Sequence, residues 1–157
     1  MRSSFTIIAT LFIAFVLTVV PMPDWASWMR PAWLLMVLMF WSINTPDRVG
    51  VGVAFLVGLI LDLMNGGLVG EHAMTFTAMI YLTSKFHLRL RMYTFLQQGA
   101  SVFLFVLAYE LIRYCIQGFI GELPMNPLYW LSSVTSVLFW PWIFALLRDC
   151  QRWFERA

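Results

Sequence analysis

The chain has 157 residues, of which 61% are hydrophobic and 11% are charged, and its formal net charge is +2. Soluble domains carry about 25% charged residues, so much of this chain cannot face water. At about 20 residues per membrane span, the length allows roughly six or seven spans and excludes a sizeable soluble domain. The few basic residues exclude the electrostatic footprint of a nucleic-acid-binding protein.

Six apolar segments predict an all-α, polytopic membrane protein built as a six-helix transmembrane bundle. The second and fourth are short for a full span, so we expect flanking residues to extend them or neighbours to cover their ends. Residues 20–23 lack a signal cleavage pattern, which predicts that the first helix is retained. No internal repeat or linker is visible, so residues 1–157 are expected to form a single membrane domain. The segments cover residues 5–21, 32–43, 47–65, 73–86, 94–116 and 128–147.

Prolines mark the expected start of three helices. Pro31, Thr45-Pro46 and Asn126-Pro127 each place proline at a first helical position, twice after a residue that can cap the helix. The pair Gly66-Gly67 predicts the end of the third helix, because glycine adopts the left-handed conformation that follows many helices.

The distribution of basic residues predicts the orientation in the membrane. Positively charged residues concentrate on the cytoplasmic side of membrane proteins. This rule places both termini of a multi-pass membrane protein in the cytoplasm. Cys115 and Cys150 then lie near opposite faces and are not expected to pair. The inner side would hold Arg2, Arg48, Lys85, Arg89, Arg91, Arg148, Arg152 and Arg156, and the outer side Arg30 and Arg113.

Asp62 is a carboxylate within the third apolar segment and close to its C-terminal end. Charged groups inside a membrane are costly, and a helix C-terminus disfavours negative charge, so a compensating group is required. Glu110 and Arg113 are spaced i and i+3 on one face of the fifth segment, at a similar depth. We expect Arg113 to neutralise Glu110 and also Asp62 in one buried polar cluster. The cluster fits a docking or ligand site, and equally a structural pair that sets helix register.

The third segment also carries a row of small residues at a spacing of four, formed by Gly50, Ala54 and Gly58. Small residues let helices approach closely in lipid, where packing drives association. Contact with another helix of this chain is favoured over contact with a partner. Gly66 and Gly70 belong to the flexible outer connection that follows.

The sequence contains no constellation that predicts catalysis, a cofactor or a metal. His72 has one neighbouring glutamate and His87 lies on another loop, which is too little for a metal site. Ser132, Ser133 and Ser136 have no base within sequence reach, so a serine nucleophile is not predicted.

Several motifs in chain order are similar to those of the rod shape-determining MreD family. The Pro-Asp-Arg and Gly-Leu-x-x-Asp elements are the most specific, and the likeness extends over nearly the whole chain. These motifs are Met22-Pro23-Asp24, Arg30-Pro31-Ala32-Trp33, Pro46-Asp47-Arg48-Val49, Gly58-Leu59-Ile60-Leu61-Asp62-Leu63 with Gly66 and Gly70, Ser132-Ser133, and Trp140-Pro141-Trp142-Ile143-Phe144.

This resemblance implies a non-enzymatic inner-membrane scaffold of the machinery that elongates the peptidoglycan wall of rod-shaped bacteria. It implies binding to the single-span protein MreC, and indirect work with MreB, RodZ and the elongation glycosyltransferase and transpeptidase. It also implies a fold like the substrate-binding subunits of energy-coupling-factor transporters. Partner contacts are expected at the row formed by Gly50, Ala54 and Gly58, or on the sixth helix. The loop from Pro21 to Pro31 and the connection from Gly66 to His72 would touch the partner's periplasmic base.

Two other functions compete with the scaffold. A small-molecule-binding subunit of a transporter would use the outer polar cluster as a ligand pocket, and would respond to its ligand by thermal stabilisation. An intramembrane enzyme would need Asp62, Glu110 and His72 within about 3 Å of a reacting atom, and the sequence does not place them so.

Overall fold

The computed structural model describes residues 2–156, and within this range it contains helices and turns but no β-strand. The predicted all-helical class is therefore confirmed. The longer helices are α1 (Arg2–Val19), α3 (Trp33–Asn44), α4 (Val51–Asn65), α5 (Glu71–Lys85), α7 (Phe95–Ile120) and α8 (Leu131–Arg156). The shorter ones are α2 (Asp24–Ser27), α6 (His87–Met92) and the 3-10 helix η1 (Pro127–Trp130).

Helix α3 is the centre of the core. Its residues from Leu34 to Ile43 are all buried, and it packs against α1, α5 and α8. A helix that is apolar all round is stable where it is surrounded on every side, which explains the position of this one. Its 12 residues are few for a membrane span of about 20 residues, and neighbouring helices cover its faces.

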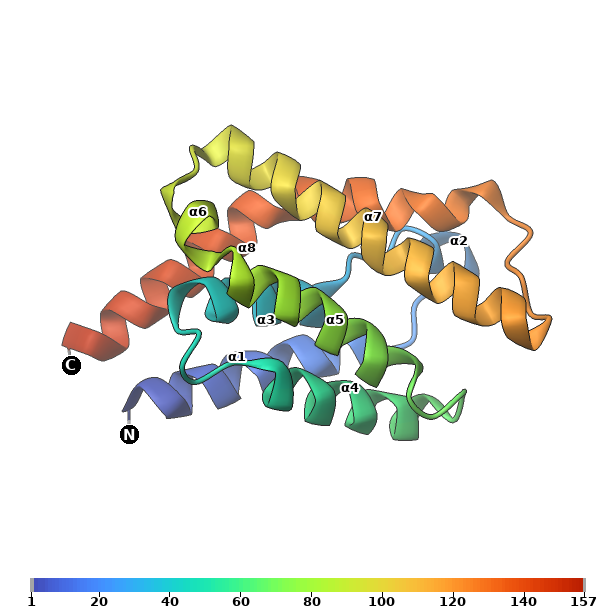
Figure 1. The fold of residues 1–157 in the computed structure, drawn as a ribbon, viewed down its shortest axis with the longest axis horizontal. Helices are drawn as coiled ribbons and strands as arrows, with labels where there is room; N and C mark the ends of the chain where they lie inside the picture. Colours follow the sequence, from blue (N-terminus) through green and yellow to red (C-terminus); the bar gives the residue numbers. More distant parts are fainter. Residues whose placement is uncertain (1, 157) are drawn as a thin grey trace.

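Successive long helices run in opposite directions, so α1 lies antiparallel to α3 whereas α5 and α8 run parallel to it (Figure 1). Helices α4 and α5 form a hairpin joined by residues 66–70, and α7 and α8 pack together on the other side of the molecule. The first and last helices also touch, since the rings of Phe5 and Phe154 lie 6.2 Å apart. Both termini therefore lie at the same end of the protein (Figure 1).

Two helices, Phe95–Ile120 and the continuous stretch Pro127–Arg156, are long and apolar enough to cross a membrane. Three shorter apolar helices cover Ser4–Val19, Trp33–Asn44 and Val51–Asn65. The last helix continues well past the predicted limit at residue 147, so the basic tail extends it rather than forming a separate segment.

The helix after Pro46 starts later than predicted. Residues 46–50 form a turn, in which the carbonyl of Thr45 accepts hydrogen bonds from the amides of Arg48 and Val49. Gly50 then adopts an extended conformation, and α4 begins at Val51. The extended Gly50 interrupts the turn before it can continue as a helix, so the predicted helix start at Pro46 is wrong.

The other two proline signals mark helix starts within a few residues. Ala32 separates Pro31 from α3. The side chain of Asn126 accepts a hydrogen bond from the Leu128 amide at 3.0 Å, and Pro127 begins η1, which runs directly into α8. Gly66 ends α4 with φ of 66°, as predicted for the left-handed residue after a helix.

Candidate functional site

Asp62 is buried at the C-terminal end of α4, and its carboxylate binds the N-terminal end of α5. Its two oxygens accept hydrogen bonds from the amides of Gly70, His72 and Ala73 at distances of 2.9 to 3.2 Å. The side chain of His72 adds a contact of 2.7 Å between its Nδ1 and Asp62 Oδ1. The carboxylate thus caps a helix that starts nine residues further along the chain.

This capping supplies the compensation that the position of Asp62 requires. The end of α4 disfavours a negative charge, whereas the free amides and dipole at the start of α5 favour one. Gly70, with φ of 103°, precedes α5 and has no side chain to cap it. Asp62 therefore stabilises the α4–α5 hairpin by a contact between its two arms.

His72 was not predicted to contact Asp62. The ten-residue separation between His72 and Asp62 matches no helical spacing. Only the hairpin turn brings the two together. The sequence did offer one signal for this contact. A polar residue, His72, lies in the first turn of the helix that follows the buried carboxylate.

The ion pair that Arg113 forms is with Glu71 rather than with Asp62 or Glu110, although its charge also acts on Glu110. Arg113 Nε donates to Glu71 Oε1 at 2.8 Å, and within residues 4–156 it forms no ion pair with Asp62 or Glu110. The cause is the start of α5, which places Glu71 beside α7. The guanidinium also lies over the ring of Tyr109, 5.6 Å from its centroid.

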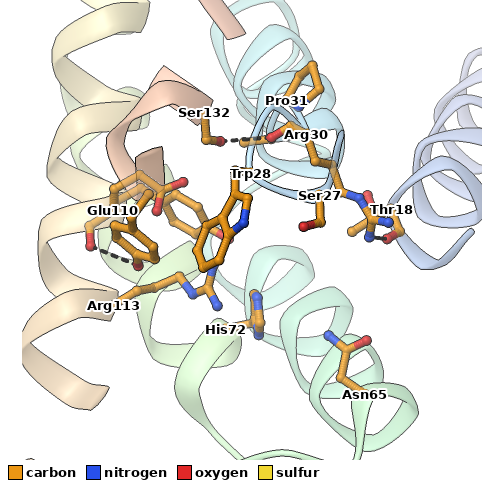
Figure 2. A pocket seen from close by; sticks show the side chains of 13 residues that line it. Thr18, Ser27, Trp28, Arg30, Pro31, Asn65, His72, Glu110, Arg113 and Ser132 are labelled. Atoms are coloured by element: carbon orange, nitrogen blue, oxygen red, sulfur yellow. Dashed lines mark hydrogen bonds between the residues drawn. The ribbon is translucent and has the colours of Figure 1, made fainter. Parts of the chain in front are cut away.

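The predicted polar residues nevertheless lie in one region. Glu110 and Arg113 line a cavity of about 330 Å³, and His72, which binds Asp62, lines it too. Figure 2 shows these side chains around the cavity with Trp28, from three different parts of the chain. Its other lining residues are Thr18, Ser27, Arg30, Pro31, Ala32, Asn65, Tyr109, Tyr129 and Ser132.

Arg30 and Pro31 connect the loop after α1 to two helices. Arg30 Nη1 and Nη2 donate to the carbonyl oxygens of Thr18 and Val20 at 2.5 and 2.6 Å, at the C-terminal end of α1. Guanidinium groups suit this end of a helix, where carbonyls lack intrahelical partners. The Arg30 carbonyl accepts from Ser132 Oγ at 2.9 Å, which ties the same segment to α8 (Figure 2).

The small residues of α4 lie against other parts of this chain. A Cβ atom built on Gly58 would lie 2.6 Å from the Ala73 Cα, and Ala54 is fully buried. Gly50 precedes the helix, with the Pro46 carbonyl oxygen 3.8 Å from an ideal Cβ position. The contact at Gly58 is with α5, so this face is not free to receive a partner helix.

The motif Pro46-Asp47-Arg48 lies at the opposite end of α4 from Asp62. Its three residues line a separate cavity of about 450 Å³ together with His87 and Arg91. Arg48 Nη1 donates to Ser4 Oγ at 3.0 Å, which links this turn to α1. Arg91 Nη2 donates to the carbonyl oxygens of Ile43 and Asn44, at the C-terminal end of α3.

No group of three or more potential metal ligands occurs among the described residues. Cys115 and Cys150 are both free and exposed. Asp62 and His72 bind each other, and Arg113 binds Glu71. These ion pairs connect helices, and they lie beneath an outer surface rich in exposed apolar side chains.

The chain is helical, and it combines two helices long enough to cross a membrane with an apolar exterior and internal ion pairs. These are the features of a membrane-associated protein. The model of the family described as rod shape-determining protein MreD matches residues 1–150. Over 148 residues, the chain is also 34% identical to the rod shape-determining protein MreD of Haemophilus influenzae. The aligned region covers 94% of this chain and 91% of that protein. No solved structure matches the chain. The chain therefore belongs to the MreD family of rod shape-determining proteins.

Proposed function

We propose that the protein is a non-enzymatic, multi-pass scaffold in the bacterial inner membrane that binds the single membrane helix of an MreC-type partner. Membership of a rod shape-determining family supports a place in the wall-elongation machinery. Through MreC the scaffold would act on MreB, RodZ and the elongation glycosyltransferase and transpeptidase. It would do so by stabilising one position or conformation of its partner, which is a coupling of binding free energies and requires no chemistry.

One observation carries the proposed binding of a helix, and it is the exposed apolar stripe of α8. Val134, Leu138, Trp142 and Leu146 recur every four residues and are 46%, 65%, 71% and 65% exposed. Residues four apart share one face of a helix. Helices associate in lipid through close packing of such faces.

Helix α8 is preferred over the small-residue row of α4 because that row is occupied. Gly58 is in contact with α5, and Ala54 is fully buried. The sequence offered both surfaces as candidates, and the stripe on α8 is the one that remains open. The partner's span would lie along it, near the inner-face tail at one end and the loop before η1 at the other.

Co-purification in mild detergent tests this proposal. The wild-type chain, co-expressed with the MreC of its own cell, should recover that protein. The double variant Leu138→Ala with Trp142→Ala removes the middle of the α8 stripe, and recovery should fall by at least about tenfold, because large apolar side chains dominate helix packing. The matched control is Leu104→Ala with Leu111→Ala on α7, where both residues are also exposed.

The folded yield of each variant alone is measured by size-exclusion chromatography. Failure of the wild type to recover MreC contradicts the proposed binding. Recovery by the wild type and equally by the α8 variant retains the binding and contradicts the surface.

The cavity beside Glu110 favours a second candidate, the small-molecule-binding subunit of a transporter. Such a subunit requires an ATPase module as a partner. Its recovery in the same co-purification, in place of MreC, would favour this function.

A further inference from the structure

Glu110 is a buried carboxylate that forms no ion pair among the described residues, although the charge of Arg113 acts on it. It is 3% exposed and lines the 330 Å³ cavity between α7, α8 and the loop before α3. Its side chain faces the hydroxyl groups of Ser132 and Tyr129. Among residues 4–156 no lysine, arginine or histidine forms an ion pair with it. A buried charge without a partner is costly, so the cavity calls for a positive group beside this carboxylate.

The same wall carries a guanidinium with unused hydrogen-bonding capacity. Arg113 binds Glu71 through Nε and also contacts the side chain of Tyr109, which leaves part of its five-donor fork free. Figure 2 shows this guanidinium on the cavity side, near His72 and Trp28. Terminal nitrogens of a guanidinium bind phosphate or carboxylate oxygens in a paired geometry.

The two groups are close, and the charge of Arg113 acts on Glu110, but they form no ion pair. They stand at i and i+3 on one face of α7, where Cβ atoms are about 5–6 Å apart. Asp62, by contrast, has its own partners in the amides at the start of α5 and the His72 ring. The Nη atoms of Arg30 bind the end of α1, and its Nε is buried without a partner. The cavity wall thus offers one acceptor for a cation and one donor for an anion, side by side.

We propose that this cavity binds a small zwitterion, with a primary ammonium on Glu110 and an adjacent phosphate or carboxylate on Arg113. The face of Trp28 suits the ammonium through cation–π attraction. Ser27 and Asn65 on the rim are exposed, so the cavity is open to entry. The zwitterion comes either from an ethanolamine phospholipid headgroup or from a free solute of the same chemistry.

Native mass spectrometry and thermal unfolding of the full chain in detergent test this assignment. The probes are phosphatidylethanolamine, phosphatidylglycerol as a lipid without the ammonium, and free phosphoethanolamine. At about 100 times its Kd, a binder should raise the Tm of the wild type by roughly 5 °C or more. Stabilisation by phosphatidylethanolamine alone identifies a lipid headgroup, and stabilisation by phosphoethanolamine as well identifies a site that also takes a free solute.

Glu110→Gln keeps the shape of the side chain and removes its charge. This variant should lose the preference for phosphatidylethanolamine over phosphatidylglycerol by at least about tenfold in retained lipid. The matched control is Asp24→Asn, an exposed carboxylate that does not line the cavity, and it should keep the wild-type preference.

Equal stabilisation of the wild type by both lipids, with none by phosphoethanolamine, overturns the proposal. Retention of the preference by Glu110→Gln overturns it too. If Glu110→Gln does not fold, Trp28→Leu takes its place, because Trp28 lines the cavity from a loop segment outside the core. An unchanged preference in that variant contradicts the site.

Discussion

Asp62 lies at the end of one helix and binds the start of the next, which explains how a carboxylate is stable in an apolar hairpin. Three backbone amides and the His72 ring surround its oxygens. The interaction is one of charge with helix dipole, reinforced by direct hydrogen bonds. Loss of the carboxylate would leave those donors buried and unpaired.

We expect Asp62→Ala to lower the free energy of unfolding by about 3 kcal/mol, the scale observed when one member of a buried pair is removed. Asp62→Asn should cost less, because its amide oxygen still accepts from part of the α5 start. Thermal unfolding in detergent measures both. The control Asp47→Ala changes an exposed carboxylate and should stay within about 0.5 kcal/mol of the wild type. Equal Tm values for Asp62→Ala and Asp47→Ala would contradict the capping role.

At the scale of elements, the α4–α5 hairpin depends on how closely its two helices approach. Gly58 faces the backbone of α5, and an added Cβ would lie 2.6 to 2.7 Å from Ala73 Cα, Ala73 N and the His72 carbonyl oxygen. Backbone atoms cannot rotate away as a flexible side chain can. The two helices would therefore have to separate.

Gly58→Ala should accordingly destabilise the protein by about 1–3 kcal/mol, the range for overpacking of a tight interior. Gly52 provides a control on the same helix, because nothing lies within 4 Å of its ideal Cβ position. Gly52→Ala should be neutral or stabilising by up to about 1 kcal/mol, since alanine favours the helix more than glycine does. Thermal unfolding of the two variants side by side decides the point, and similar losses in both would contradict a close approach at Gly58.

At the scale of the whole molecule, the two termini meet at one end of the helix bundle. The contact between Phe5 and Phe154 places α1 and the tail of α8 together. The basic residues of the turn after α3, of α6 and of the tail are expected at this same side by the positive-inside rule. The fold thus agrees in geometry with termini that share one face of the membrane.

A thiol-labelling experiment checks which face that is. In the variant Cys115→Ser, Cys150 is the remaining cysteine, and it is exposed on the tail helix. A membrane-impermeant maleimide should label it in permeabilised spheroplasts but not in intact ones. With both native cysteines replaced by serine, Glu122→Cys in the loop before η1 should be labelled in intact spheroplasts. The reverse pattern would contradict the proposed orientation.

Local sequence determined which segments are helical. Long apolar runs satisfy their backbone polar groups most simply as helices, and glycine with φ of 66° at residue 66 ends α4 where the sequence predicts it. The same logic missed the short helices α2 and α6 and misplaced the start of α4. The start of α4 depends on the extended conformation of Gly50, which the local sequence does not encode.

Only the tertiary structure decided which polar groups meet. The sequence showed that Asp62, Glu110 and Arg113 need partners, because charge in an apolar chain requires compensation. It could not show that Asp62 binds His72 or that Arg113 binds Glu71, because both pairings depend on the close approach of α4 to α5 and the position of α7. The sequence thus determines the need for compensation, and the packing of helices determines which group provides it.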